Sequence, residues 1–156
     1  MAVDRTDLRI LAALQDDADL SVSELARRLD MPLSSCHRRL RALEDARIIR
    51  KRVALVDADR VGLGTTAFIA IRTSRHDSDW LATFARNVAP MPEVMEMHRL
   101  SGQVDYMLKV AVADIASLDA FYKRLIAVAP LLDVSTSFSM ERIKESTALP
   151  LAMVRV

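Results

Sequence analysis

Residues 21–45 read SVSELARRLDMPLSSCHRRLRALED and decide the fold of the N-terminal third of the chain. Ser21 and Glu24 have the spacing of a capping box, in which the serine hydroxyl accepts from the third helical amide and the glutamate reaches back to the cap. The apolar residues that follow predict a short helix ending near Leu29. Asp30 then tolerates the left-handed backbone conformation that a tight turn needs.

A second, longer helix is predicted over residues 33–45. Cys36, Leu40 and Leu43 recur at i, i+4 and i+7 and predict its buried stripe. Another amphipathic helix, over residues 4–14, precedes the pair. A short capped helix, a tight turn and a longer helix form the helix-turn-helix arrangement, whose second helix can enter the major groove of DNA.

Positive charge is concentrated on and after this second helix. The whole chain has a net charge of only +1, yet residues 27–52 hold nine Arg or Lys against three acidic residues. Such a segment is typical of a polyanion-binding surface or of a solvated face, and the helix-turn-helix context favours DNA. We predict Ser34, Ser35, His37 and Arg38 at base edges or in the groove, and Arg39, Arg41, Lys51 and Arg52 at phosphates.

Two short strands are predicted after the helix, at residues 48–49 and 50–56, and would form a wing. Residues 1–56 are therefore predicted to be a winged helix-turn-helix DNA-binding domain. The next segment, residues 57–66, holds two of the three glycines and has no helical period, so it is interpreted as a linker.

The rest of the chain, residues 67–156, is predicted to be one ferredoxin-like domain, which makes the protein α+β. Helices are expected to start near Asp77 or Ser78 and at Asp114, and an approximate internal repeat at an offset of 40 residues supports two copies of one unit. The element order is βαββαβ. Its strands are predicted at residues 67–73, 94–100, 105–112 and 132–140.

Both helices of such a domain cover one face of the sheet. The first strand carries apolar residues on both faces, Phe68 among them, so the other face needs a partner. A second copy of the chain is the simplest candidate, and a two-fold dimer would also present two recognition helices to DNA.

Composition excludes several classes of protein. No apolar run reaches the ~18 residues of a membrane span, and the first ten residues lack the apolar core of a secretory signal, so we expect a cytoplasmic protein without a membrane partner. The single Cys36 permits no internal disulfide; it fits a core position better than a redox switch. With three scattered histidines as well, we expect no metal and no cofactor.

Taken together, these segments resemble the Lrp/AsnC family of feast-or-famine transcription regulators over nearly the whole chain. The resemblance implies a winged helix-turn-helix, a linking strand and an effector-sensing ferredoxin-like domain. It also implies a homodimer that commonly assembles to an octamer. The matching pieces are DLRIL at 7–11, ELA at 24–26, RL at 39–40, LE at 43–44, GL at 62–63, GQVDY at 102–106 and ALPL at 148–151.

The same resemblance implies that the effector is an amino acid bound at the interface between dimers, near the turn at Gly102. The pieces PLSSCHRRL and MPEV are similar to the branch that contains the cysteine-detoxification regulator, which makes cysteine a candidate effector. Asp105 could pair with the amino group of the ligand or hold the turn shut. Serines on the last strand could bind ligand or simply face solvent. The predicted effector residues are Leu100, Ser101, Gly102, Gln103, Val104, Asp105, Tyr106, Ser135, Thr136 and Ser137.

The sequence departs from the family pattern at five positions. Asp30 replaces the common glycine of the helix-turn-helix, Pro32 the Ser or Thr that opens the recognition helix, and Ala46 the glycine before the wing. In the sensing turn, Gln103 replaces an acid and Val104 an aromatic residue. The last two change the ligand pocket directly, so the effector cannot be copied from a relative.

Two other functions compete with a ligand-responsive regulator. An architectural DNA-binding protein would share the same DNA-binding half and have no ligand. Some proteins of this overall fold decarboxylate a haem precursor, which would draw on His76, His98 and Arg99. No Ser/His/Asp or Cys/His spacing is evident, so we favour a regulator that is not an enzyme.

Overall fold

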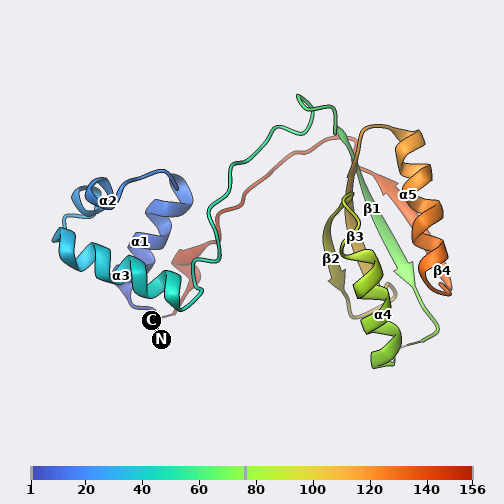
Figure 1. Ribbon diagram of the computed structural model, residues 1–156, viewed down its shortest axis with the longest axis horizontal. Coiled ribbons are helices and arrows are strands. Elements are labelled where there is room, and N and C mark those ends of the chain that lie inside the picture. Colours follow the sequence, from blue (N-terminus) through green and yellow to red (C-terminus); the bar gives the residue numbers. More distant parts are fainter. Residues whose placement is uncertain (1, 76, 156) are drawn as a thin grey trace. The chain divides into compact units, whose positions relative to one another are not determined.

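The computed structural model describes residues 2–75 and 77–155, which form two compact units (Figure 1). Unit 1 comprises Met1–Leu55 together with Ile143–Val156, and unit 2 comprises Val56–Arg142. His76, which the enzyme interpretation invoked, lies outside the described residues.

Three helices build unit 1: α1 (Arg5–Asp16), α2 (Val22–Arg28) and α3 (Leu33–Asp45). The predicted capping box at the start of α2 is present, because the Glu24 amide donates to the Ser21 hydroxyl at 3.3 Å and the Ser21 amide donates to the Glu24 carboxylate at 2.9 Å. Asp30 has φ 52°, which confirms the left-handed turn between α2 and α3. The helix-turn-helix follows from these local signals.

The core of unit 1 is a single apolar cluster contributed by all three helices. The predicted stripe of α3 is confirmed, since Cys36, Leu40 and Leu43 are all buried. The remaining buried members are Ile10, Ala13, Leu25, Ala26 and Leu29.

The predicted wing strands are wrong. Ile48 and Ile49 donate their amides to the carbonyl of Leu43, at 2.9 and 3.2 Å, and so finish α3. Residues 50–56 are exposed and, within the part of the chain that the structure describes, contain no strand. A strand requires a neighbouring backbone for its amide and carbonyl groups, and no described segment pairs with this one.

After α3, the residue with the left-handed backbone conformation typical of glycine is Arg47 and not Ala46. Arg47 has φ 54°, whereas Ala46, the residue that caps the end of α3, has φ −76°. The departure that the sequence placed at Ala46 therefore belongs one residue later. A non-glycine residue in the left-handed region carries a conformational cost.

The C-terminal segment does not belong to the ferredoxin-like unit, where the sequence placed it. Residues 143–156 lie with unit 1 and end in a 3-10 turn, Leu151–Met153. The side-chain amide of Gln15 in α1 holds this segment at both backbone groups of Leu149: it accepts from the amide at 2.7 Å and donates to the carbonyl at 3.2 Å. The DNA-binding unit is thus built from two separate stretches of chain.

Unit 2 has the predicted βαββαβ order and a four-stranded antiparallel sheet with strand order β2-β3-β1-β4. Asp77 and Asp114 cap the two helices, with carboxylates that accept from Trp80 and Ser117 amides at 2.8 and 2.7 Å. The elements are β1 (Thr65–Arg72), α4 (Ser78–Val88), β2 (Val94–Arg99), β3 (Tyr106–Val112), α5 (Ile115–Val128) and β4 (Asp133–Phe138).

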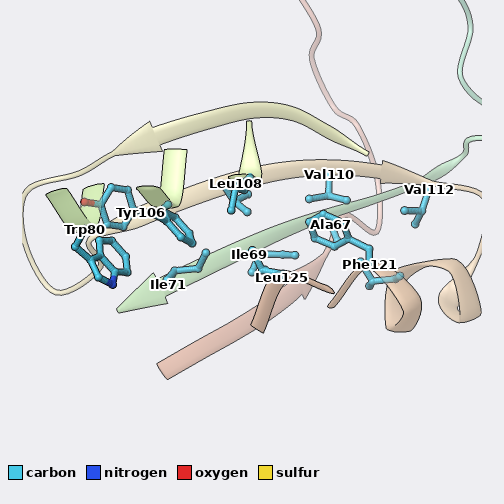
Figure 2. Packing of buried hydrophobic residues seen from close by; sticks show 13 residues of the cluster. Ala67, Ile69, Ile71, Trp80, Tyr106, Leu108, Val110, Val112, Phe121 and Leu125 are labelled. Atoms are coloured by element: carbon cyan, nitrogen blue, oxygen red, sulfur yellow. The ribbon is translucent and has the colours of Figure 1, made fainter. Parts of the chain in front are cut away.

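Strand alternation puts the core on one face of this sheet. Alternate residues of β1 and β3 are buried against α4 and α5, so both helices cover the same face (Figure 2). Trp80 and Tyr106 lie at one end of the cluster and Val112 at the other. The two units therefore have separate apolar cores.

The opposite face of the sheet is more polar than the sequence led us to expect. Phe68 is 40% exposed there, but its register partners on β3 and β4 are Lys109 and Ser137. Glu96 on β2 bonds to Lys109 and to His98, each at 3.1 Å. This face combines the apolar side chains of Phe68 and Met107 with small, polar and charged residues.

Candidate DNA interface and candidate effector site

The exposed side of α3 carries the residues predicted to read bases. Ser34, Arg38 and Arg41 lie at i, i+4 and i+7, which places them on one face of the helix, and all three are exposed. This face is opposite the buried stripe of Cys36, Leu40 and Leu43. His37 is exposed beside it, whereas Ser35 is half-buried at its margin.

Arg39 lies at the same margin, is half-buried, and is bonded to two carboxylates of the protein itself. Its Nη1 donates to Asp7 Oδ1 and to Asp4 Oδ2, each at 2.8 Å. The Asp7 carboxylate, then that of Asp4, raises the pKa of the Arg39 guanidinium. The pKa of Asp4 is held below its usual range by the Asp7 backbone amide and by Arg39. The sequence assigned Arg39 to phosphate as one of the cations of the basic segment. Its two partners lie more than thirty residues away along the chain, so the local pattern did not reveal them.

The two cations after α3 differ in their surroundings. Lys51 is exposed, and Arg52 forms an ion pair with Glu44 of α3 at 3.0 Å. A groove between the start of α2 and α3 is lined by Ser21, His37, Arg41 and Arg52, among others. Arg41 and Arg52 are therefore neighbours around one surface depression.

Cys36 is buried in the core of unit 1, and burial raises the pKa of its thiol. A raised pKa lowers the thiolate fraction that redox chemistry requires. Both observations favour the core role for Cys36.

The predicted effector turn connects β2 to β3. The Leu100 amide donates to the Asp105 carbonyl at 2.8 Å, which closes the turn. Gly102 has φ 126°, a conformation that residues with a side chain rarely adopt, although open space surrounds the position where a Cβ would lie. Leu100, Ser101, Gly102 and Gln103 are exposed, and Val104 is half-buried.

Asp105 holds this turn to the neighbouring strand. Its Oδ2 accepts from the Thr73 amide at 2.8 Å, and its own amide donates to the Ile71 carbonyl at 3.0 Å. Of the two roles considered for this carboxylate, fastening the turn is thus visible in the structure. Binding an amino group stays a prediction.

Tyr106 lies in the core and not on the surface of the turn. It is 2% exposed, and its ring is 5.7 Å from that of Trp80 and 5.4 Å from that of Phe84. Trp80 is buried too, and its indole N–H has no acceptor among the described residues. The sequence offered no sign that the only tryptophan packs beside the sensing turn.

The residues predicted on the last strand lie apart from the turn within one chain. Ser135 and Ser137 are exposed and pair with Ala70 and Phe68 of β1, on the face without helices. Thr136 is half-buried and pairs with Ile69. Because β4 is an edge strand, β1 separates it from β3 and the turn.

Residues 2–75 and 77–155 contain no group of three or more His, Cys, Asp or Glu that could hold a metal ion. None of the helices in those residues is both long enough and apolar enough to cross a bilayer.

Comparison with known families connects both halves of the chain to one group of proteins. The family model described as Lrp/AsnC ligand binding domain matches residues 66–149, and the model described as winged helix-turn-helix DNA-binding matches residues 3–50. The chain belongs to the Lrp/AsnC family. This Lrp/AsnC protein is therefore a DNA-binding transcriptional regulator with a C-terminal ligand-binding domain, as its sequence predicted.

Relatives of this Lrp/AsnC chain match it over nearly its whole length. It is 44% identical over 150 residues to the DNA-binding transcriptional activator DecR of Escherichia coli, covering 96% of this chain and 99% of the relative. It is also 44% identical over 149 residues to the glutamate uptake regulatory protein of Zymomonas mobilis, covering 96% of this chain and 91% of that one.

Solved structures with the same fold include two that cover nearly the whole chain. An AsnC family transcriptional regulator from Agrobacterium tumefaciens is 47% identical, with a TM-score of 0.92, covering 97% of this chain and 99% of that one. A transcriptional regulator from Neisseria meningitidis, solved in complex with L-Met, is 36% identical, with a TM-score of 0.89, covering 96% of this chain and 97% of the other.

Proposed function

We propose that this regulator reads double-stranded DNA with the exposed face of α3 and that an amino acid bound near the β2–β3 turn controls its binding. The observation that carries the DNA part is the arrangement of α3, where exposed Ser34, Arg38 and Arg41 lie opposite a fully buried stripe. A helix of this kind can present its polar face to base edges while its other face stays in the core.

The side chains divide by role. Arg38, with Ser34, Ser35 and His37, is assigned to base edges, because arginine reads guanine bidentately and serine accepts or donates to either kind of base. Arg41, Lys51 and Arg52 are assigned to phosphates, and Arg52 exchanges its exposed ion pair with Glu44 for a phosphate at little cost.

The effector part rests on the geometry of the turn and on one neighbour. Gly102 and the bond from Thr73 to Asp105 hold a defined, exposed loop at one end of the sheet. The structural neighbour from Neisseria meningitidis binds L-Met, which supports an amino-acid effector for this chain. Cysteine is retained as a candidate because of the residues shared with the cysteine-detoxification branch.

We further propose a cytoplasmic homodimer that assembles to larger oligomers, with the effector at the interface between dimers. Ser135 to Ser137 lie on an edge strand away from the turn in one chain, so they join a ligand site only if a second copy brings them to it. A ligand that binds one assembly more tightly shifts the equilibrium by that difference in affinity.

Thermal unfolding of the full chain against each standard amino acid tests the effector. A ligand present at 100 times its dissociation constant, binding only folded protein, adds about 2.7 kcal/mol to the free energy of unfolding. A raised midpoint with one chemical class of amino acid identifies the effector class. No shift with any amino acid would refute an amino-acid effector and favour an architectural role, which uniform affinity across DNA sequences would support.

A further inference from the structure

We infer that Arg39 is a positioning residue that fixes the orientation of the recognition helix through Asp4 and Asp7, and that base reading by Ser34 and Arg38 depends on it. The inference rests on the proposed function of α3 and replaces the phosphate contact that the sequence assigned to Arg39.

The first argument is that Arg39 completes a closed set of hydrogen bonds. Asp4 and Asp7 cap each other at the start of α1: Asp4 Oδ1 accepts from the Asp7 amide at 2.9 Å, and Asp7 Oδ2 accepts from the Asp4 amide at 3.0 Å. The remaining oxygen of each carboxylate accepts from Arg39 Nη1. All four carboxylate oxygens therefore accept a hydrogen bond. Within this set, only the two bonds from the Arg39 guanidinium join α1 to α3.

The second argument is burial. Asp7 is 2% exposed, so its charge has little access to water. A buried carboxylate that loses its only cationic partner is strongly destabilised. The apolar contacts that also join α1 to α3 are non-directional, whereas the bonds to Arg39 have a defined geometry. They can set how far α3 is rotated about its own axis, and hence where Arg38, the preceding residue, points.

The third argument is electrostatic. Two carboxylates and one guanidinium sum to −1, so this cluster does not attract a phosphate as an unpaired arginine does. Arg41, two residues further along the same helix, is exposed and has no ion pair among the described residues. It provides a matched control for removal of one arginine from α3.

The experiment compares Arg39→Met, Arg39→Lys, Asp7→Asn and Arg41→Met in the full chain. Each is titrated with two probes of equal length: the duplex that the wild-type protein selects best from a random library, and a mixed-sequence duplex. Both titrations are repeated over a range of salt concentration, and circular dichroism verifies that each variant is folded.

We expect Arg39→Met and Asp7→Asn to lower the preference for the selected duplex by about tenfold, comparable to the loss of one base contact. Their salt dependence should stay that of the wild type. Arg39→Lys should recover much of the preference, because one nitrogen makes both bonds and an ammonium can replace it. Arg41→Met should lower the affinity for both probes alike and reduce the slope of log affinity against log salt concentration by about 0.9.

The opposite pattern would overturn the inference. If Arg39→Met reduced the salt slope as Arg41→Met does, and Asp7→Asn left the preference unchanged, Arg39 would be a phosphate contact. Should Arg39→Met fail to fold, Arg39→Lys and Asp7→Asn still decide between the two roles. A wild-type protein with no preferred duplex would instead refute the proposed function itself, before any variant is measured.

Discussion

The exposed face of α3 and the β2–β3 turn are both surface sites, but they are held in place differently. Arg38 and Arg41 extend from a helix whose buried side fixes it, and neither has an ion pair among the described residues. Asp105, in contrast, fastens its own turn to β1, and Gly102 adopts a backbone conformation that residues with a side chain rarely adopt. Substitution of Arg38 or Arg41 can therefore remove function without loss of stability, whereas substitution of Asp105 or Gly102 changes the stability of the turn as well.

The largest expected effect tests whether the two units are separate in stability as well as in structure. Phe121→Ala removes a fully buried side chain of unit 2 and should lower its free energy of unfolding by about 3–5 kcal/mol. Urea titration followed by Trp80 fluorescence reports on unit 2 alone, because Trp80 is the only tryptophan. Leu43→Ala in unit 1 is the control and should leave this transition in place. Equal shifts from both variants would show that the two units unfold together.

The next effect separates the two roles of Asp105. Asp105→Ala removes the acceptor for the Thr73 amide and should cost about 1.5–3 kcal/mol of unfolding free energy. Asp105→Asn keeps an oxygen that can accept from Thr73 but has no charge for an amino group. We expect Asn to restore much of the stability and to lose the midpoint shift given by the effector. A retained shift in Asp105→Asn would leave the carboxylate with the turn-fastening role only.

On α3 the expected loss is in binding. Arg38→Ala should weaken binding to the selected duplex by about 1–3 kcal/mol and binding to mixed-sequence DNA by less. Its unfolding free energy should stay within about 0.5 kcal/mol of the wild type. Arg86→Ala removes one exposed positive charge from α4 of unit 2 and is the control for a general change in charge. Equal losses on both duplexes would assign Arg38 to a phosphate.

A smaller effect is expected at Gly102. Gly102→Ala meets no steric obstacle, so its cost arises from the positive φ and should be about 1 kcal/mol in the stability of unit 2. Ser101→Ala, at the exposed neighbouring position, should have almost no effect. If the two variants were equally stable, the turn would tolerate a different backbone conformation.

The smallest effect is a pH dependence on the face of the sheet without helices. His98 and then Lys109 hold the pKa of the Glu96 carboxyl below its usual value of 4.5. A depressed pKa in the folded state stabilises the fold above the unfolded value, and the contribution is lost as pH falls through the folded pKa. Glu96→Gln should therefore be slightly less stable near neutral pH and equal to the wild type in strong acid. A difference that persists in acid would have another cause.

Local signals in the sequence predicted the helix-turn-helix and the sheet. The Ser21–Glu24 capping box, the apolar spacing along α3 and the strand alternation of β1 and β3 each determine an element within a few residues. The partners of Arg39 could not be predicted in this way, because charge identifies a cation but not the carboxylate that folding brings to it. The strands predicted for the wing are absent for a related reason, since the composition of residues 50–56 suits a strand but the described chain supplies no neighbour.

Placement of the last residues was wrong because they have no periodicity to interpret. Residues 143–156 carry no helical or alternating pattern, and the bonds that join them to unit 1 include those of Gln15, a polar side chain on α1. The turn residues Asp105 and Tyr106 show the same limit. Their neighbours in sequence suggested a ligand site, and only the fold shows that one fastens the turn and the other fills the core.

The return of residues 143–156 to unit 1 has a mechanical consequence. Unit 2 is an insertion within unit 1, joined to it by two covalent connections, at residues 55–56 and 142–143. A domain held by two connections has less freedom to move than a domain held by one. A ligand-driven change in unit 2 would therefore reach both stretches of the DNA-binding unit and not just one of them.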